Sequence, residues 1–426
     1  MEQIKKTLSS FENRGGFHIF FSTILLRVIQ FVLGVFIIRL LTKEDYGNLS
    51  YAFSITQLIL PFSGAGLYLS LMHFGAIQEK LEDKFKLFSY TIRRGFFYSL
   101  IVITLIMSLS GLISNRMPGA IHYLRLFSIY IISYYLFYSV MSLLRIMKQN
   151  KYYAASLLVN SLLVFGLSLL GVYLAQGSGY TLGFVIAPAI TGIVVLYVLK
   201  IRHKGSIKIF GPQGDLPVKT SEYTKYGIYA GLGNIASQMA WQLDTIMIGA
   251  ILAQSTMVAT YKVAALIPFS LIFIPSVFMQ TDFVYIAEKY NNKQYLINYY
   301  KKYFLIFSVI VLATLITWYF LSDWIVKLFG PEYIEAKSII NILMINIVGT
   351  FLFRVPLGNI LAAVGKAKWN TYSAVVLLVV NFILNYLLIP KYNIYGAAYA
   401  TVSSISLSCI ISIIMFIVYL RQIDKP

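Results

Sequence analysis

Five ionisable side chains interrupt stretches of the sequence that are otherwise apolar. Four are cations, Arg27, Arg39, Lys262 and Arg354, and one is an acid, Asp244. A charged side chain near the centre of a lipid bilayer costs roughly 2.5–3.5 kcal/mol on insertion scales, so each of these residues is a functional candidate by default. Arg27 is the strongest candidate, because about ten residues separate it from either end of its apolar run, too deep for easy snorkelling to an interface.

The excess of cations over acids inside these runs predicts the chemistry of a ligand. A cationic interior suits an anionic group such as a phosphate or pyrophosphate, for which the planar guanidinium of arginine is a good donor. Arg39 lies near the outer end of the first apolar run, and Arg354 lies beside Pro356. A snorkelling anchor remains the alternative for Arg39, and a structural pair remains the alternative for Arg354.

Asp244 and Lys262 lie on either side of a short loop, so both are expected in the outer half of one helical hairpin. Two interpretations stay open for them. They form a structural ion pair, or they form a proton or sodium-ion site that makes and breaks this pair. Trp241 lies one turn before Asp244 and either lines the same cavity or packs against a neighbouring helix.

The composition shows which elements must position these residues. Of the 426 residues, 58% are hydrophobic and only 12% are charged, against roughly 25% charged in a soluble domain. A helix needs about 20 mainly apolar residues to cross a bilayer, and about twelve such runs occur. We therefore predict an all-α polytopic membrane protein with spans near residues 17–41, 47–72, 94–114, 121–144, 153–175, 181–200, 227–252, 258–281, 303–323, 336–362, 369–389 and 395–420.

The distribution of Lys and Arg predicts the orientation of these spans. The chain holds 35 Lys and Arg against 16 Asp and Glu, a net charge of +19. About 25 of the basic residues fall on one side of the twelve spans and about six on the other, as the positive-inside rule requires if both termini are cytoplasmic. Because long apolar runs separate the basic residues, the charge does not indicate a nucleic-acid partner. One Cys and four scattered His predict no metal, cofactor or catalytic site.

A polar stretch with several Gly and Pro, residues 201–225, divides six spans from six. We predict an N-terminal lobe of residues 1–200, a cytoplasmic linker of residues 201–225 and a C-terminal lobe of residues 226–426. Six spans return the chain to its starting side, so the lobes should be related by a pseudo-two-fold axis along the membrane normal, as in transporters.

An internal repeat supports the two-lobe prediction. Residues 151–183 overlay residues 368–400 at one constant offset, which pairs Gly179 with Gly396. Prolines also interrupt corresponding spans of the two halves. We predict Pro61, Pro268 and Pro275 as hinges, with static kinks as the alternative.

Several short segments in a fixed order resemble one known family. They are residues 39–47 (RLLTKEDYG), 244–249 (DTIMIG), 361–368 (LAAVGKAK), 385–390 (NYLLIP) and 395–401 (YGAAYAT). Together, over roughly residues 15–420, they resemble the bacterial polysaccharide biosynthesis proteins, the lipid-linked oligosaccharide (O-antigen, Wzx-type) flippases. These are relatives of the multidrug and toxin exporters within the multidrug/oligosaccharidyl-lipid/polysaccharide exporter superfamily.

The resemblance implies a flippase that turns an undecaprenyl-pyrophosphate-linked oligosaccharide, an O-antigen or a capsule or exopolysaccharide repeat unit, across the bacterial inner membrane by alternating access. It implies as partners the lipid bilayer, a coupling ion (H⁺ or Na⁺), and the polysaccharide polymerase and chain-length proteins. It also implies an ion-coupling role for Asp244 and substrate contacts at Arg27, Arg39, Trp241, Lys262 and Arg354.

Other classes of protein stay open. A cation-coupled drug or small-molecule exporter of the same superfamily would have the same fold, but it is expected to hold an acid in the first lobe, and spans one and two contain none. A sugar-porter-like facilitator would carry a Gly-x-x-x-Asp-Arg loop, which residues 73–94 lack. A membrane enzyme such as a polymerase or glycosyltransferase would need a large water-exposed loop with acids, whereas the only long loop here is basic.

Overall fold

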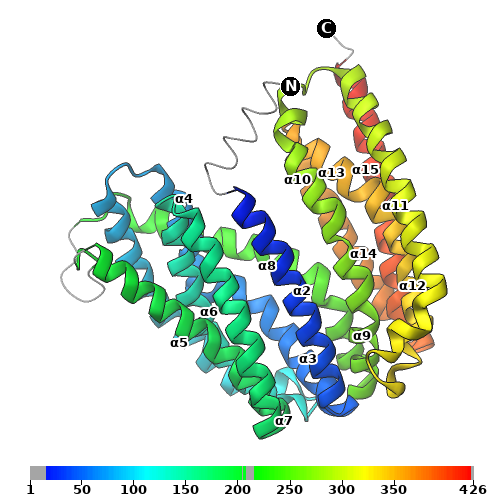
Figure 1. Cartoon of the computed structure of the whole chain (residues 1–426), viewed down its shortest axis with the longest axis horizontal. Coiled ribbons are helices and arrows are strands. Elements are labelled where there is room, and N and C mark those ends of the chain that lie inside the picture. Colours follow the sequence, from blue (N-terminus) through cyan, green and yellow to red (C-terminus); the bar gives the residue numbers. More distant parts are fainter. Residues whose placement is uncertain (1–15, 204, 208–214, 424–426) are drawn as a thin grey trace. The chain divides into compact units, whose positions relative to one another are not determined.

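The computed structural model describes residues 16–203, 205–207 and 215–423, and all regular structure in them is helical (Figure 1). Six of the basic residues that we assign to the cytoplasmic side lie outside the described residues, as do residues 204 and 208–214 of the predicted linker; the six are Lys5, Lys6, Arg14, Lys204, Lys208 and Lys425. Within the described ranges, nine helices are long and apolar enough to cross a membrane, by length and composition.

Packing divides the chain into two compact units, unit 1 (Met1–Gln238) and unit 2 (Met239–Pro426). The elements of unit 1 are α2 (Gly16–Leu40), α3 (Lys43–Ile59), η1 (Leu60–Gly66), α4 (Leu67–Ile77), α5 (Leu81–Ile113), α6 (Ala120–Ile146) and α7 (Asn150–Arg202). Those of unit 2 are α9 (Ser255–Leu271), α10 (Phe273–Glu288), α11 (Lys293–Lys327), η2 (Pro331–Tyr333), α12 (Ala336–Gly349), η3 (Thr350–Arg354), α13 (Val355–Ala363), α14 (Ala367–Tyr392) and α15 (Ile394–Ile423). Helix α8 (Thr220–Leu252) begins in unit 1 and ends in unit 2.

The first half of α8 packs tightly within unit 1. The backbones of Gly66 and Gly227 lie so close that neither position has room for a side chain. The Ser70 hydroxyl donates to the Tyr223 carbonyl (2.7 Å), and the Tyr223 and Thr91 hydroxyls share a hydrogen bond (2.7 Å). The packing of the chain therefore divides inside α8, while the lobe boundaries at residues 200 and 226 stay a prediction.

Helix α7 has 53 residues, about twice the length that a bilayer requires, and it is two antiparallel arms. The chain reverses at Gln176, whose φ and ψ are 48° and −134°. Gly171 lies before this turn and Gly179 after it, and the backbones of the two residues touch. Because α7 supplies two spans, and α2 and α8 are long helices outside the nine, the described residues contain the twelve predicted spans and the predicted fold class is confirmed.

Helices α14 and α15 form the matching hairpin in unit 2. Their turn residue Asn393 has φ 53° and ψ −137°, nearly the values of Gln176, and these two positions pair at the offset of the sequence repeat. The residues that precede the two hairpins, Lys148 (φ 58°) and Gly365 (φ 82°), also pair at this offset and both have positive φ. The internal repeat predicted from the sequence is therefore present in the backbone.

Candidate functional site

Asp244 is the centre of a buried polar cluster in unit 2 and is only 8% exposed. One carboxylate oxygen accepts hydrogen bonds from the hydroxyls of Tyr261 (2.6 Å) and Thr401 (2.5 Å), and the other accepts from Asn385 Nδ2 (2.7 Å). The amide nitrogen of Asn385 also donates to Asn381 Oδ1 (3.0 Å). Helices α8, α9, α14 and α15 therefore meet at one carboxylate, which we call the Asp244 cluster (Asp244, Tyr261, Asn381, Asn385 and Thr401).

The Asp244 cluster has the oxygen chemistry of a cation site. Asn385 is fully buried, and within the described part of the chain its Oδ1 has no hydrogen-bond partner. An unsatisfied buried acceptor costs about 1–3 kcal/mol, which a bound cation would recover. Carboxylate, amide and hydroxyl oxygens are the ligands that hard cations prefer. The cluster can therefore exchange a cation or a proton at Asp244 while keeping its remaining hydrogen bonds.

Lys262 and Trp241 flank this cluster on the α8–α9 hairpin. The Lys262 amine donates to Gln242 Oε1 (3.0 Å), and its charge interacts with that of Asp244. The residue that binds Asp244 directly is Tyr261, the neighbour of Lys262 in the sequence. Trp241 stands edge-on to Phe269 with ring centroids 5.5 Å apart and keeps 44% of its surface exposed. The structure thus brings these three predicted residues together on one hairpin.

Arg27 lies in the middle of α2 in unit 1, with an exposed side chain. Its charge interacts with the Tyr138 side chain of α6. Tyr138 ends a row of three tyrosines one turn apart, in which the ring centroids of Tyr130 and Tyr134 are 5.8 Å apart and those of Tyr134 and Tyr138 are 4.2 Å apart. Phenol hydroxyls at the depth of a membrane are costly to leave in lipid. The α6 tyrosine row therefore holds hydroxyls that require polar partners, and its last member lies within electrostatic range of Arg27.

Arg39 and Arg354 are not members of the Asp244 cluster. Arg39 is exposed in the last turn of α2. Arg354 ends the single π-helical turn η3, is half-buried, and interacts electrostatically with Cys409. Such π turns are frequent at functional sites, and this one leads directly into Pro356 of α13.

The predicted hinge prolines lie at breaks in the helices. Pro61 is in η1, which separates α3 from α4 and holds three residues with non-helical backbone angles, Ser63, Gly64 and Ala65. Pro268 and Pro275 flank the junction of α9 and α10 at Ile272. The junction at Ile272 has the expected cause, because Pro275 removes a backbone donor and clashes with the preceding turn, whereas the non-helical residues of η1 follow Pro61. Movement at these breaks stays a prediction.

The neutral members of the Asp244 cluster were not predicted as site residues. Asn385 and Thr401 belong to two of the segments that carry the family resemblance, and Tyr261 belongs to the predicted second-lobe hairpin. Two asparagines one turn apart in an apolar span are the signal that could have revealed the cluster. The α6 tyrosine row has a similar signal, a tyrosine at every fourth position from Tyr130 to Tyr138.

Comparisons with known proteins identify solved structures that share the fold. Solved structures with the same fold include a multidrug resistance MATE family transporter of the MOP superfamily in an inward-facing conformation (12% identity, 94% of this chain and 96% of that chain, TM-score 0.75) and the lipid II flippase MurJ in an inward closed conformation (14%, 95% and 89%, TM-score 0.76). A MOP superfamily transporter from Pyrococcus furiosus also matches (12%, 96% and 96%, TM-score 0.65). The all-helical architecture of the chain is therefore the fold that these solved structures share.

The sequence also matches two protein-family models. Residues 13–280 match the polysaccharide biosynthesis protein family, and residues 230–387 match the MatE family. The first match covers more than half of the chain, so the chain belongs to the polysaccharide biosynthesis protein family, as the resemblance implied. No curated protein matches the sequence.

Proposed function

We propose that this protein is a flippase that moves an undecaprenyl-pyrophosphate-linked oligosaccharide across the bacterial inner membrane by alternating access. The observation that carries the proposal is Arg27, an exposed arginine at mid-span beside the α6 tyrosine row, in a chain of the polysaccharide biosynthesis protein family. The guanidinium would hold the pyrophosphate, and the tyrosines offer hydroxyls and ring faces to the first sugars.

Substitution of Arg27 tests this function in cells. We expect Arg27→Ala to abolish surface display of the polysaccharide, because no other mid-span cation in α2 can replace the lost charge, and Arg27→Lys to retain part of it. Arg116→Ala, which removes an exposed arginine of a loop, is the matched control and should leave display unchanged. Polysaccharide at the surface is measured by immunoblot at equal membrane levels of the protein. Normal display by Arg27→Ala would rule out this mechanism.

We further propose that the Asp244 cluster couples translocation to Na⁺ or H⁺. The orphaned Asn385 oxygen and the three exchangeable donors to Asp244 support this role. Coupling between two ligand sites typically spans roughly 5- to 150-fold in affinity. In proteoliposomes, Asp244→Asn should therefore flip a fluorescent lipid-linked oligosaccharide at a rate that no longer responds to a Na⁺ or pH gradient.

Asp323→Asn removes an exposed acid of α11 that pairs with Lys337 and serves as the control. It should respond to the gradients as the unaltered protein does. A gradient response that survives in Asp244→Asn would exclude Asp244 as the coupling residue.

A second candidate function is favoured by the MatE match over residues 230–387. Under this alternative the chain exports organic cations in exchange for Na⁺ or H⁺. Gradient-driven uptake of tetraphenylphosphonium by everted vesicles, lost in Asp244→Asn, would support the exporter. Flipping of a lipid-linked oligosaccharide without such uptake would support the flippase.

A further inference from the structure

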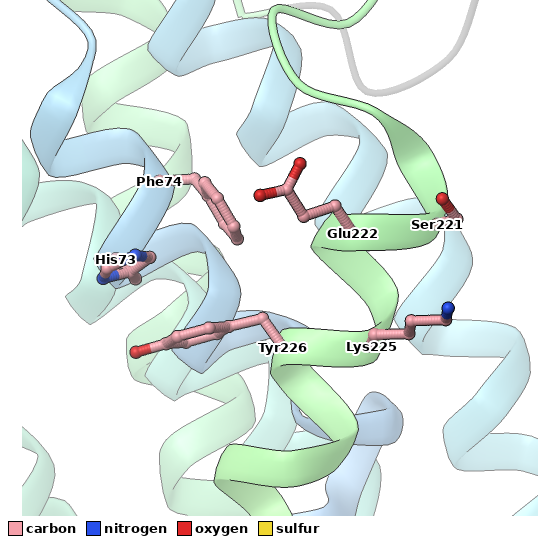
Figure 2. A pocket seen from close by; sticks show the side chains of 6 residues that line it. All are labelled: His73, Phe74, Ser221, Glu222, Lys225 and Tyr226. Atoms are coloured by element: carbon pink, nitrogen blue, oxygen red, sulfur yellow. The ribbon is translucent and has the colours of Figure 1, made fainter.

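An aromatic cleft of about 440 Å³ opens between α4 and the first turns of α8, within unit 1 (Figure 2). Its lining comes from His73 and Phe74 of α4 and from Ser221, Glu222, Lys225 and Tyr226 of α8. The volume lies in the range of about 300–1,000 Å³ that is typical of small-molecule sites. The lining of the cleft includes neither Arg27 nor a residue of the Asp244 cluster.

The walls of the cleft are held rigidly. Tyr223, one turn before Gly227, is completely buried behind the cleft, where its hydroxyl bonds Thr91 and its carbonyl bonds Ser70. The close contact of Gly227 with Gly66 fixes the next turn of α8 against η1. A preformed wall lowers the ordering cost of binding, so a weakly interacting ligand can still be recognised.

The rings in the cleft form a platform. His73 stacks on Tyr226 with centroids 4.4 Å apart and an interplanar angle of 11°, and Phe74 meets Tyr226 edge-on at 5.4 Å. Since His73 covers one face of Tyr226, the rings do not enclose a ligand with several free faces, as a cage for an organic cation does. The Phe74 and Tyr226 rings instead give the cleft an apolar surface, which suits a flat ligand whose polarised C–H groups lie against it.

The charged groups of the cleft are one acid and one base, so their formal charges cancel. In Figure 2 the Glu222 carboxylate faces the Phe74 ring, while the Lys225 amine points away from both. In the part of the chain that the structure describes, no hydrogen bond or ion pair occupies the side chains of His73, Ser221, Glu222 or Lys225. A carboxylate accepts hydrogen bonds from hydroxyls and repels phosphate. The combination of ring platform, free acceptor and free donors fits an uncharged sugar ring.

We propose that this cleft binds a neutral sugar ring of the lipid-linked oligosaccharide, a hexose or an N-acetylhexosamine, separately from the pyrophosphate. The inference rests on the proposed flippase function and adds a saccharide subsite to it. The sugar ring packs against the Phe74 and Tyr226 rings in the cleft, and its hydroxyls donate to Glu222. The subsite thereby distinguishes glycosylated from bare carrier lipid.

The test compares two probes on the full chain in nanodiscs, bare undecaprenyl pyrophosphate and undecaprenyl-pyrophosphate-linked disaccharides of neutral hexoses and N-acetylhexosamines. We expect the unaltered protein to bind at least one glycosylated probe about tenfold more tightly than the bare lipid, from one packed sugar ring and its hydrogen bonds. Tyr226→Ala and Glu222→Gln should bring the ratio of the two affinities, glycosylated probe over bare lipid, close to one. Neither substitution should weaken binding of the bare lipid. Tyr226→Phe, which keeps the ring, should retain the preference.

Tyr229→Ala is the matched control, because Tyr229 lies on the same helix, is 73% exposed and does not line the cleft. It should retain the full preference. A preference that persists in both Tyr226→Ala and Glu222→Gln, or equal binding of all probes by the unaltered protein, would overturn the saccharide subsite. Displacement of the glycosylated probe by tetraphenylphosphonium would overturn it in favour of an organic cation. Failure to bind even the bare lipid would instead contradict the proposed function itself.

Discussion

Asp244 receives three hydrogen bonds from neutral side chains, and this arrangement differs from a static ion pair. A carboxylate in a static ion pair keeps the same cation as its partner. Hydroxyl and amide donors, in contrast, can reorient when a cation or proton binds to the carboxylate. Lys262 remains near enough to interact with Asp244 while bonding Gln242. The sequence predicted Asp244, Lys262 and Trp241 because charges and indoles stand out in apolar runs. It did not predict the donors, because the partners of a neutral side chain depend on how α14 and α15 pack against α8 and α9.

The role of a single hydrogen-bond donor, the Thr401 hydroxyl of α15, can be tested by substitution. Thr401→Val keeps the shape of the side chain but removes one hydrogen bond to Asp244, so we expect a loss of about 1–3 kcal/mol in unfolding free energy. Thermal unfolding in detergent, with and without Na⁺, measures the loss and any ion-dependent stabilisation. Thr314→Val is the control, because the Thr314 hydroxyl bonds only the Ile310 carbonyl of its own helix. Equal effects of the two substitutions would contradict a special role for Thr401.

At the scale of elements, the two repeated hairpins share a backbone but differ in what they hold. The repeat pairs Thr401 of the Asp244 cluster with Phe184, which packs against Phe53 (5.3 Å) and Tyr130 (5.1 Å) in unit 1. It pairs Asn385 with Ser168, whose hydroxyl bonds the Tyr180 carbonyl. One copy therefore has aromatic packing where the other has a polar site. The sequence predicted the repeat from glycine spacing, but side-chain chemistry at paired positions has to be compared in the structure to show this asymmetry.

The turn of the α7 hairpin makes a prediction about stability. Gln176 has φ 48°, a backbone region that costs a non-glycine residue roughly 1–3 kcal/mol. Gln176→Gly should therefore raise the thermal unfolding midpoint in detergent. Asn393→Gly at the equivalent turn should raise it less, because asparagine tolerates positive φ better than glutamine does. A lower midpoint for Gln176→Gly would show that the side chain stabilises the turn by other means.

At the scale of the whole molecule, the predicted orientation in the membrane rests on basic residues that lie outside the predicted apolar runs. Composition and loop charge predicted the twelve spans, and the described helices extend beyond most of the predicted apolar runs. Helix α5, for example, begins at Leu81 whereas the apolar run begins near residue 94. Hydropathy marks the lipid-embedded part of a helix, while hydrogen bonding continues the helix into water. Composition and loop charge could not locate the boundary between the two packing units, because that boundary lies inside the continuous helix α8.

Cysteine labelling can test the predicted orientation. The single native cysteine, Cys409, is buried and gives little background. An impermeant maleimide added to spheroplasts should label Arg116→Cys, on the predicted outer side, and should label Asn291→Cys only after the membrane is permeabilised. Both positions are exposed in the structure. The reverse labelling pattern would invert the topology.

Helix α8 supplies residues to both proposed binding sites. It carries Tyr226 of the aromatic cleft and Asp244 of the polar cluster about five turns apart on one backbone, at roughly 3.6 residues per turn. The first part of this helix packs in unit 1 and its second part packs in unit 2, so one helix belongs to both proposed sites. Thermodynamic linkage then requires reciprocity: if Na⁺ alters the affinity for sugar, sugar alters the affinity for Na⁺ by the same factor.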